Sequence, residues 1–195
     1  MSRWWGGAGP AITHFANSMN STPSSGNSPE APSPERSFFR FENLLVALVC
    51  AEVDFAVVGG VAISLNGYVR ATEDADVIVS EVPDNIRKLL RCLEGWGEGW
   101  ARELKPEEFI AQEGSIRVME DFDLDIFTRM RGRSLEDFRP RLRFLETQGV
   151  RIPYISPQDL IYLKQNSWRD KDKLDVQAMQ EIIRRESQAG GQTQA

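Results

Sequence analysis

The sequence predicts an α/β (α+β) fold, in which a small mixed β-sheet is flanked by helices. The first observation is that short, mainly apolar runs, such as Phe55–Val58 and Ala75–Val79, are rich in branched residues and too short for core helices. The second is that segments with apolar residues at helical spacing lie between such runs. Strand and helix patterns therefore alternate along the chain, which is typical of a sheet with helices packed against it.

The expected elements follow one another between residues 38 and 186. In chain order they are a helix over 39–52, a strand over 55–58, a helix over 61–66, a strand over 75–79, a helix from Pro83, a hairpin with strands around 116–118 and 122–126, a polar helix over 135–145, a strand over 150–155 and a helical region over 157–186 with a bend near 166–169. Gly67 stops the second helix, and Ser156-Pro157 caps the last helical region.

The chain of 195 residues is predicted to hold one folded domain between two flexible tails. Residues 1–37 are rich in proline and serine and lack an apolar face, so we expect disorder there. Residues 38–186 form the domain, and residues 187–195 form a Gly/Gln-rich flexible tail. His14, the only histidine, lies in the first tail, so histidine catalysis and a histidine-ligated metal are not expected in the domain.

Composition and charge narrow the class of protein further. The net charge of −6 disfavours a protein that binds nucleic acid by bulk electrostatics, since such proteins carry a basic excess. No apolar run approaches the ~20 residues of a membrane span, so no membrane partner is expected. Cys50 and Cys92 are expected as buried thiols without a disulfide framework, which favours a cytoplasmic location.

A pair of glycines follows the first predicted strand. Gly59 and Gly60 would let the backbone turn sharply and approach a ligand closely. The helix that follows offers unpaired N–H groups, which suit a phosphate. This pattern occurs in many folds without a ligand, so by itself it is weak.

Two pairs of acids make the pattern more specific. Asp74 and Asp76 begin the second strand, and side chains two residues apart in a strand project to the same face. Two like charges so close favour a compensating cation, and Mg²⁺ takes carboxylate and phosphate oxygens. Asp123 and Asp125 alternate with apolar residues in a later strand, where acids are costly unless paired or metal-bound. Three carboxylates on neighbouring strands would suit two-metal phosphoryl transfer.

These motifs resemble the first motif of the DNA polymerase beta-like nucleotidyltransferase superfamily. The resemblance rests on Gly59-Gly60, then thirteen residues, then Asp74-x-Asp76. Gly67 and the Arg70-x-Thr72 step make the pattern similar to the minimal bacterial branch of the superfamily. That branch includes AbiE-type toxins of type IV toxin–antitoxin systems and some aminoglycoside nucleotidyltransferases. The resemblance implies the polymerase beta-like nucleotidyltransferase fold with a C-terminal helical segment.

A later segment strengthens the comparison with the toxins. Lys164, followed by Arg169-x-Lys171-Asp172-x-x-Asp175, is similar to the closing motif of that group, and the whole resemblance covers about residues 40–183. The alternative is a solvated helix face in which Arg169 pairs with Asp172 and Lys171 with Asp175. On a continuous helix, however, Lys164, Lys171 and Asp175 would share one face.

The resemblance implies a role for each motif. Asp74, Asp76 and Asp125 would be the catalytic, metal-binding carboxylates, with two Mg²⁺ ions expected and Asp123 as the alternative third acid. Asp125 would also assist deprotonation of the acceptor. The nucleotide-binding residues would be Gly59, Gly60, Arg70, Thr72, Lys164, Arg169 and Asp172. Arg70 and Thr72 could equally anchor a turn.

The implied activity is transfer of a nucleoside monophosphate from a nucleoside triphosphate to a hydroxyl acceptor. In the toxin-like version the acceptor is RNA, in particular a tRNA end, and an antitoxin protein is a partner. In the alternative version the acceptor is a small, aminoglycoside-like molecule, and a third alternative is a non-catalytic binding or regulatory protein. Six arginines favour an RNA surface unless they lie on an ordinary exposed helix: Arg129, Arg131, Arg133, Arg139, Arg141 and Arg143.

Overall fold

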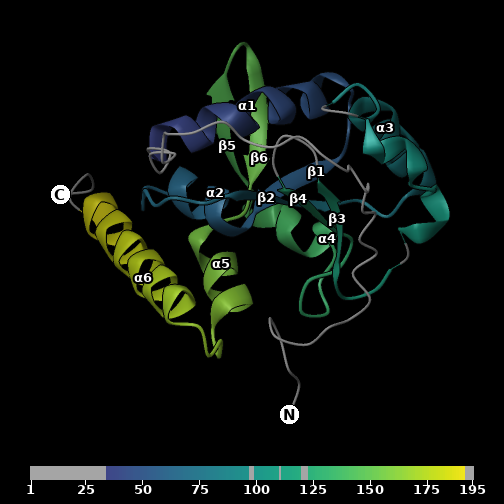
Figure 1. The fold of residues 1–195 in the computed structure, drawn as a ribbon. Coiled ribbons are helices and arrows are strands. Elements are labelled where there is room, and N and C mark those ends of the chain that lie inside the picture. Colours follow the sequence, from purple (N-terminus) through teal and green to yellow (C-terminus); the bar gives the residue numbers. More distant parts are fainter. Residues whose placement is uncertain (1–33, 97–98, 110, 120–122, 192–195) are drawn as a thin grey trace, which may run out of the picture.

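The computed structural model describes residues 34–96, 99–109, 111–119 and 123–191. Six strands form one sheet: β1 (Phe55–Val58), β2 (Asp74–Val79), β3 (Ser115–Met119), β4 (Asp123–Phe127), β5 (Arg143–Thr147) and β6 (Val150–Tyr154). The α-helices are α1 (Pro34–Cys50), α2 (Gly59–Leu65), α3 (Pro83–Leu93), α4 (Leu135–Phe138), α5 (Pro157–Lys164) and α6 (Asp170–Gly191). Three short 3-10 helices complete the described elements: Trp100–Glu103, Pro106–Glu108 and Arg139–Arg141. The α/β prediction is confirmed (Figure 1).

The sheet is mixed, with the strand order β3-β4-β2-β1-β6-β5. Strands β2 and β4 are adjacent and parallel, and β3 pairs antiparallel with β4 at the edge of the sheet. Strand β1 pairs antiparallel with β2 and parallel with β6, so it joins β3, β4 and β2 to the β5–β6 hairpin. The predicted acids of β2 and β4 therefore lie on adjacent parallel strands.

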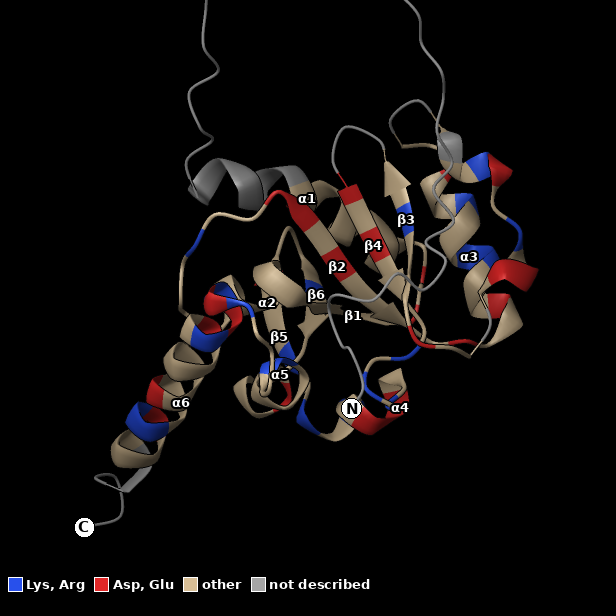
Figure 2. Cartoon of the chain, turned by 60° about the horizontal axis from the view of Figure 1, so that its bottom comes forward, with Lys and Arg blue, Asp and Glu red and all other residues tan. Residues whose placement is uncertain are grey.

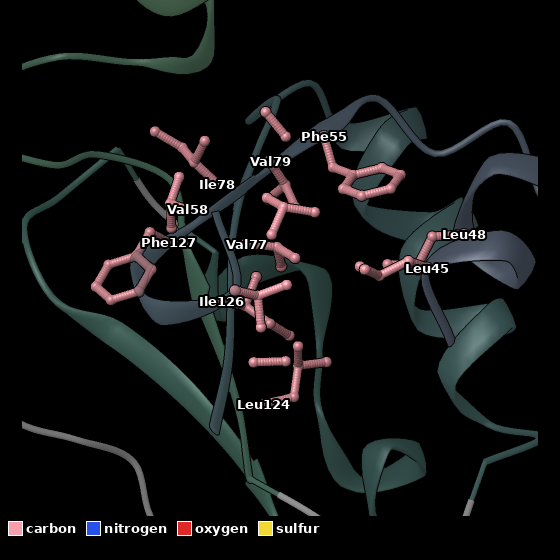
Figure 3. Close-up of a cluster of buried hydrophobic side chains, with 14 of the residues drawn as sticks. Leu45, Leu48, Phe55, Val58, Val77, Ile78, Val79, Leu124, Ile126 and Phe127 are labelled. Atoms are coloured by element: carbon pink, nitrogen blue, oxygen red, sulfur yellow. The ribbon is translucent and has the colours of Figure 1, made fainter. Parts of the chain in front are cut away.

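Alternation along the strands gives the sheet two different faces. Val77 and Ile126 are register partners and lie on the same face, which is packed against α1 through residues such as Leu45 and Leu48 (Figure 3). The other face carries Asp76 and Asp125, and it becomes apolar farther along the strands. The apolar alternation anchors the strands in the core, so the acids project from a fixed position.

Most predicted elements are present at their expected positions, but the polar helix over 135–145 is wrong. Helix α4 is a single turn, and Pro140 lies in the 3-10 turn that follows it, because proline cannot continue an α-helix. Residues 143–147 instead form β5, which pairs antiparallel with β6. Gln148 and Gly149 both have positive φ angles, which suits the tight turn of this hairpin.

The last helical region consists of two helices rather than one bent helix. Helix α5 ends at Lys164, and Asn166 adopts a positive φ angle in the connection before α6. Helix α6 continues to Gly191, past the predicted helix end at 186. The break lets α5 and α6 pack against each other, so residues on their facing sides meet (Figure 1).

Three further sequence expectations concern the surface and the ends of the chain. Cys50 is exposed and Cys92 is half-buried, so the prediction of two buried thiols is wrong. Within the described ranges, no helix is both long and apolar enough to cross a membrane. The predicted tail over 1–37 lies largely outside the described residues, so the tail boundaries stay predictions.

Candidate active site

Three carboxylates from two adjacent strands converge at one point of the sheet. Asp74 and Asp76 lie on β2 and Asp125 lies on β4, and one carboxylate oxygen of each lies within 4.8 Å of the others. Asp76 and Asp125 are register partners, so their side chains leave the sheet on the same face. Figure 2 shows acidic residues on β2 and β4 and a basic residue on the neighbouring β3. Asp74, Asp76 and Asp125 are called the carboxylate triad below.

Asp123, the alternative third acid, lies beside the triad rather than in it. It is the register partner of Asp74, and its carboxylate accepts a hydrogen bond of 3.2 Å from Arg117. Asp125 is the more enclosed of the two β4 acids. The choice of Asp125 over Asp123 as the third converging carboxylate therefore agrees with the geometry.

The two glycines are required by the close approach of other residues of the site. Gly59, the first residue of α2, has a φ angle of +60°, and a Cβ atom there would lie 1.8 Å from Oδ2 of Asp76. A Cβ on Gly60 would lie 2.6 Å from the Thr72 hydroxyl and 3.0 Å from Nη2 of Arg70. The backbone N–H of Gly60 donates a hydrogen bond to Asp76. Side chains at either position would displace the residues that frame the triad.

The fold neutralises the negative charge of the triad only in part, since Arg117 pairs with Asp125 but the carboxylates of Asp74 and Asp76 still repel each other. Burial, followed by repulsion from Asp74 and Asp125, raises the pKa of Asp76 to about 7. The charge of Lys164 and the hydrogen bond from Gly60 act in the opposite direction but do not cancel these effects. Asp76 therefore ionises only near neutral pH, and a bound cation would favour its ionised form.

The donor set fits a hard divalent cation. Three carboxylate oxygens from Asp74, Asp76 and Asp125 approach one another closely enough to share an ion, and oxygen ligands of this type suit Mg²⁺. A bound cation would also remove the repulsion that raises the pKa of Asp76. When bound, such an ion would polarise phosphoryl oxygens and stabilise developing negative charge.

Thr72 and Arg70 link the triad to the C-terminal helices. The Thr72 hydroxyl lies 2.8 Å from a carboxylate oxygen of Asp74, to which it donates a hydrogen bond. Arg70 donates from Nη2 to Asp175 of α6 at 3.2 Å, and its Nε lies 3.0 Å from the same carboxylate. The nucleotide-binding role that the sequence allowed for these two residues stays a prediction.

Lys164 lies between two buried acids of α6. Its ammonium group lies 2.6 Å from Asp172 and 3.0 Å from Asp175, and the Ser167 hydroxyl donates to Asp172 at 2.7 Å. Burial opposes ionisation of Asp172, but the hydrogen bonds from Lys164 and Ser167 hold its pKa below the usual value. Lys164, Arg70, Asp172 and Asp175 are called the buried ion cluster below. It contains two cations and two anions, so its charges balance.

The alternative of a solvated helix face paired Asp172 with Arg169 and Asp175 with Lys171. In the structure both acids instead form ion pairs with Lys164. Lys171 is exposed, whereas Lys164 and Asp175 are buried, so these three residues do not share one face. The break before α6 explains the difference, because it turns Lys164 towards the first turns of α6. Arg169 precedes α6, and its guanidinium lies 6.0 Å from the centre of the Trp168 ring. Its place in a nucleotide site stays a prediction.

Arg117 is a site residue that the sequence reasoning missed. It donates hydrogen bonds of 2.9 and 2.6 Å to the two oxygens of Asp125, and the Ser115 hydroxyl lies 3.2 Å from the same carboxylate. The bonds to Asp125 are the main reason why the pKa of Arg117 is raised. Period-two alternation in β3 could have placed Arg117 on the acidic face, but only once the hairpin register was known.

The six arginines between 129 and 143 have partners within the chain. Arg131 donates to the backbone carbonyls of Tyr162 and Gln165. The other five form ion pairs: Arg129 with Glu81, Arg133 and Arg141 with Asp159, Arg139 with Asp54 and Glu136, and Arg143 with Glu186. These contacts hold α4, β5 and α5 together and weaken the sequence argument for an RNA surface.

Comparison with protein families agrees with this geometry. Residues 41–186 match the family described as nucleotidyltransferase of unknown function, DUF6036. The chain belongs to this family. The DUF6036 match includes all three carboxylates of the triad and the whole buried ion cluster. No curated protein matches the sequence.

Solved structures align with this DUF6036 chain at low sequence identity, and LnuA supports a shared fold. The lincomycin-bound lincosamide antibiotic adenylyltransferase LnuA aligns with a TM-score of 0.50 at 15% identity, covering 76% of this chain and 97% of that one. A candidate nucleotidyltransferase from Thermotoga maritima has a TM-score of 0.47 at 19% identity, with coverage of 83% and 98%. ANT(2″)-Ia in complex with adenylyl-2″-tobramycin has a TM-score of 0.48 at 12% identity, with coverage of 75% and 88%. The fold is that of polymerase beta-like nucleotidyltransferases.

Proposed function

We propose that the protein transfers a nucleoside monophosphate from a nucleoside triphosphate to a hydroxyl acceptor, with release of pyrophosphate. The observation that carries this proposal is the convergence of Asp74, Asp76 and Asp125 within 4.8 Å, beside a glycine pair at the start of a helix. Membership of a nucleotidyltransferase family supports the same reaction class. Two Mg²⁺ ions would stabilise the charge that develops on the triphosphate.

The roles of the residues follow from their positions. Asp74 and Asp76 would hold the ion that binds the triphosphate, and Asp125 would hold the ion at the attacking hydroxyl and assist its deprotonation. Gly59 and Gly60 leave space for the phosphates beside Asp76. Thr72, Arg70 and Asp172 would position these groups. Lys164, whose charge already acts on Asp76, would face the nucleotide side of the site, with Arg169 at its border.

The acceptor is the finer part of the proposal. In the AbiE-like, toxin-like version it is an RNA, in particular a tRNA end, and a small antitoxin protein would bind the enzyme. The internal pairing of the six arginines and the net charge of −6 favour the second version, a small hydroxyl-bearing molecule. LnuA, an antibiotic adenylyltransferase with a similar fold, provides a precedent for such acceptors.

The test is transfer of label from each of the four nucleoside triphosphates, labelled at the α-phosphate, in the presence of Mg²⁺. Total RNA, purified tRNA, and a panel of aminoglycosides and lincosamides would serve as separate acceptors. We expect label in one acceptor class with the wild type and none with Asp76→Asn. Label in RNA would support the toxin-like version, and label in a small molecule would support the other. Absence of label from every acceptor would contradict the proposed activity.

A further inference from the structure

The guanidinium of Arg117 lies against the carboxylate triad in the position of a counter-ion. Arg117 and Asp125 are register partners on β3 and β4, and Asp125 and Asp76 are register partners on β4 and β2. The three side chains therefore form one row across the sheet, on one face. Arg117 binds both oxygens of Asp125 and also contacts Asp123 at 3.2 Å. Electrostatic attraction from Asp74 reaches it as well.

The two partners of this ion pair differ in their freedom to move. The Asp125 side chain is 8% exposed and projects from an inner strand, whereas the Arg117 side chain is 38% exposed and projects from the edge strand β3. Rotation of Arg117 into solvent would leave the hydrogen bonds of the sheet intact. Movement of Asp125 would disturb the buried triad. Arg117 is therefore the partner that can leave.

Arg117 also competes with a cation for the same carboxylate. Its paired hydrogen bonds occupy one lone pair on each oxygen of Asp125, and the Ser115 hydroxyl donates to one of these oxygens. A metal ion at Asp125 would meet both fewer available lone pairs and a positive charge a few ångströms away. Both effects weaken binding of the ion.

We propose that Arg117 is an exchangeable counter-cation of Asp125, which neutralises this carboxylate until a divalent ion displaces the guanidinium. The inference rests on the proposed metal-dependent function and adds a control to it. The ion at Asp74 and Asp76 binds without displacement of Arg117, whereas the ion at Asp125 binds only as Arg117 leaves. The oxygens of Asp125 are likewise occupied while Arg117 holds them, so assembly of the second ion site and contact of Asp125 with the acceptor hydroxyl depend on the same movement.

The test compares Arg117→Gln with Arg129→Gln in the full-length protein. Arg129 is the control because it is similarly exposed and forms an ion pair, with Glu81, just beyond the end of β4. Mn²⁺ binding is measured by calorimetry, and thermal unfolding is measured with EDTA and with Mn²⁺. Removal of the competing charge should tighten Mn²⁺ binding on the order of tenfold. The metal-free Arg117→Gln protein should unfold at a lower temperature than the wild type, and Mn²⁺ should remove this difference.

A structural role alone gives a different pattern. Arg129→Gln should lower the unfolding temperature equally with EDTA and with Mn²⁺, and should leave Mn²⁺ affinity unchanged. The same pattern in Arg117→Gln would overturn the inference. If Arg117→Gln does not fold, Arg117→Lys decides, since it keeps the charge but loses the two-point contact: tighter Mn²⁺ binding supports the inference and unchanged binding refutes it. None of these measurements depends on nucleotidyl transfer, so a failure of the proposed function is recognised separately by the absence of label transfer.

Discussion

The carboxylate triad and the buried ion cluster both contain aspartates, but these are fully matched by cations only in the cluster. In the buried ion cluster, Asp172 and Asp175 are matched by Lys164 and Arg70 at 2.6 to 3.0 Å. In the triad, Asp76 has a pKa of about 7 because burial and two neighbouring acids oppose its ionisation. A charge-balanced cluster can hold helices together without a ligand, whereas an unbalanced one favours a bound cation. The two regions therefore differ in what should happen when one charge is removed.

Asp76→Asn should have the largest effect. The substitution keeps the size of the side chain but removes a ligand and a repelled charge, so metal-free stability should be unchanged or higher. Metal affinity should fall by more than the roughly tenfold to hundredfold that loss of an outer-shell partner causes. Calorimetric titration with Mn²⁺ measures the loss of metal affinity, and label transfer measures the loss of activity that should accompany it. Asp172→Asn, in the buried ion cluster, is the matched control and should keep Mn²⁺ binding. Equal losses of Mn²⁺ affinity in the two variants would erase the distinction.

Lys164→Met should have the next largest effect, on stability. It leaves Asp172 and Asp175 without their shared cation, and loss of one partner of a buried ion pair costs roughly 3–5 kcal/mol of unfolding free energy. Urea unfolding measures this cost. Lys173→Met is the control, since Lys173 forms a solvent-exposed pair with Asp170 that water screens. A Lys164→Met protein as stable as the control would show that the cluster is not structural.

Gly59→Ala should disturb the triad with a smaller loss of stability. The new Cβ would lie 1.8 Å from Asp76 in a left-handed backbone conformation, which itself costs of the order of 1–3 kcal/mol. Displacement of Asp76 should weaken Mn²⁺ binding. Gly67→Ala separates strain from displacement, because Gly67 has a φ angle of +104° but no heavy atom lies within 4 Å of the added Cβ. Mn²⁺ affinity that falls equally in both variants would count against the contact with Asp76.

Local rules determine only part of the triad. Period-two alternation places Asp74 and Asp76 on one face, whereas the choice of Asp125 over Asp123 came from the family resemblance, and its convergence with the other two depends on the pairing of β2 with β4. The buried ion cluster depends on contacts between residues far apart, such as Arg70 and Asp175, which no local pattern specifies. Arg117 required the register of the β3–β4 hairpin.

The β5 strand was missed for a different reason. Arginine-rich segments with scattered apolar residues resemble a polar helix, although Pro140 breaks the helix and the Gln148-Gly149 turn closes a hairpin. The turn residues were the available signal, since glycine with a positive φ angle is typical of two-residue hairpin turns. In this segment the turn residues therefore indicate the structure better than composition does.

The effect of pH concerns one carboxyl group, that of Asp76. Asp76 has a higher pKa in the folded protein than its usual 3.8, so the metal-free folded state keeps a proton that the unfolded state has lost. The free energy of unfolding should therefore fall as pH rises from about 4 to about 7, and this contribution should level off above that. Stabilisation by Mg²⁺ should grow over the same interval, since the ion binds the ionised carboxylate.

Thermal unfolding across this pH interval, with EDTA and with Mg²⁺, measures both trends. Asp76→Asn is the control, because it removes the titrating group and should abolish the growth of Mg²⁺ stabilisation with pH. If the wild type and Asp76→Asn showed the same pH dependence, the unbalanced charge would lie elsewhere than on Asp76.

Crystals soaked in Mn²⁺ would test the central claim most directly, through an anomalous difference map. We expect a peak bounded by Asp74, Asp76 and Asp125, and no peak at Asp172 or Asp175. A peak at the buried ion cluster, or none at the triad at saturating Mn²⁺, would contradict the view that the triad is the open, cation-binding site and the cluster the closed one.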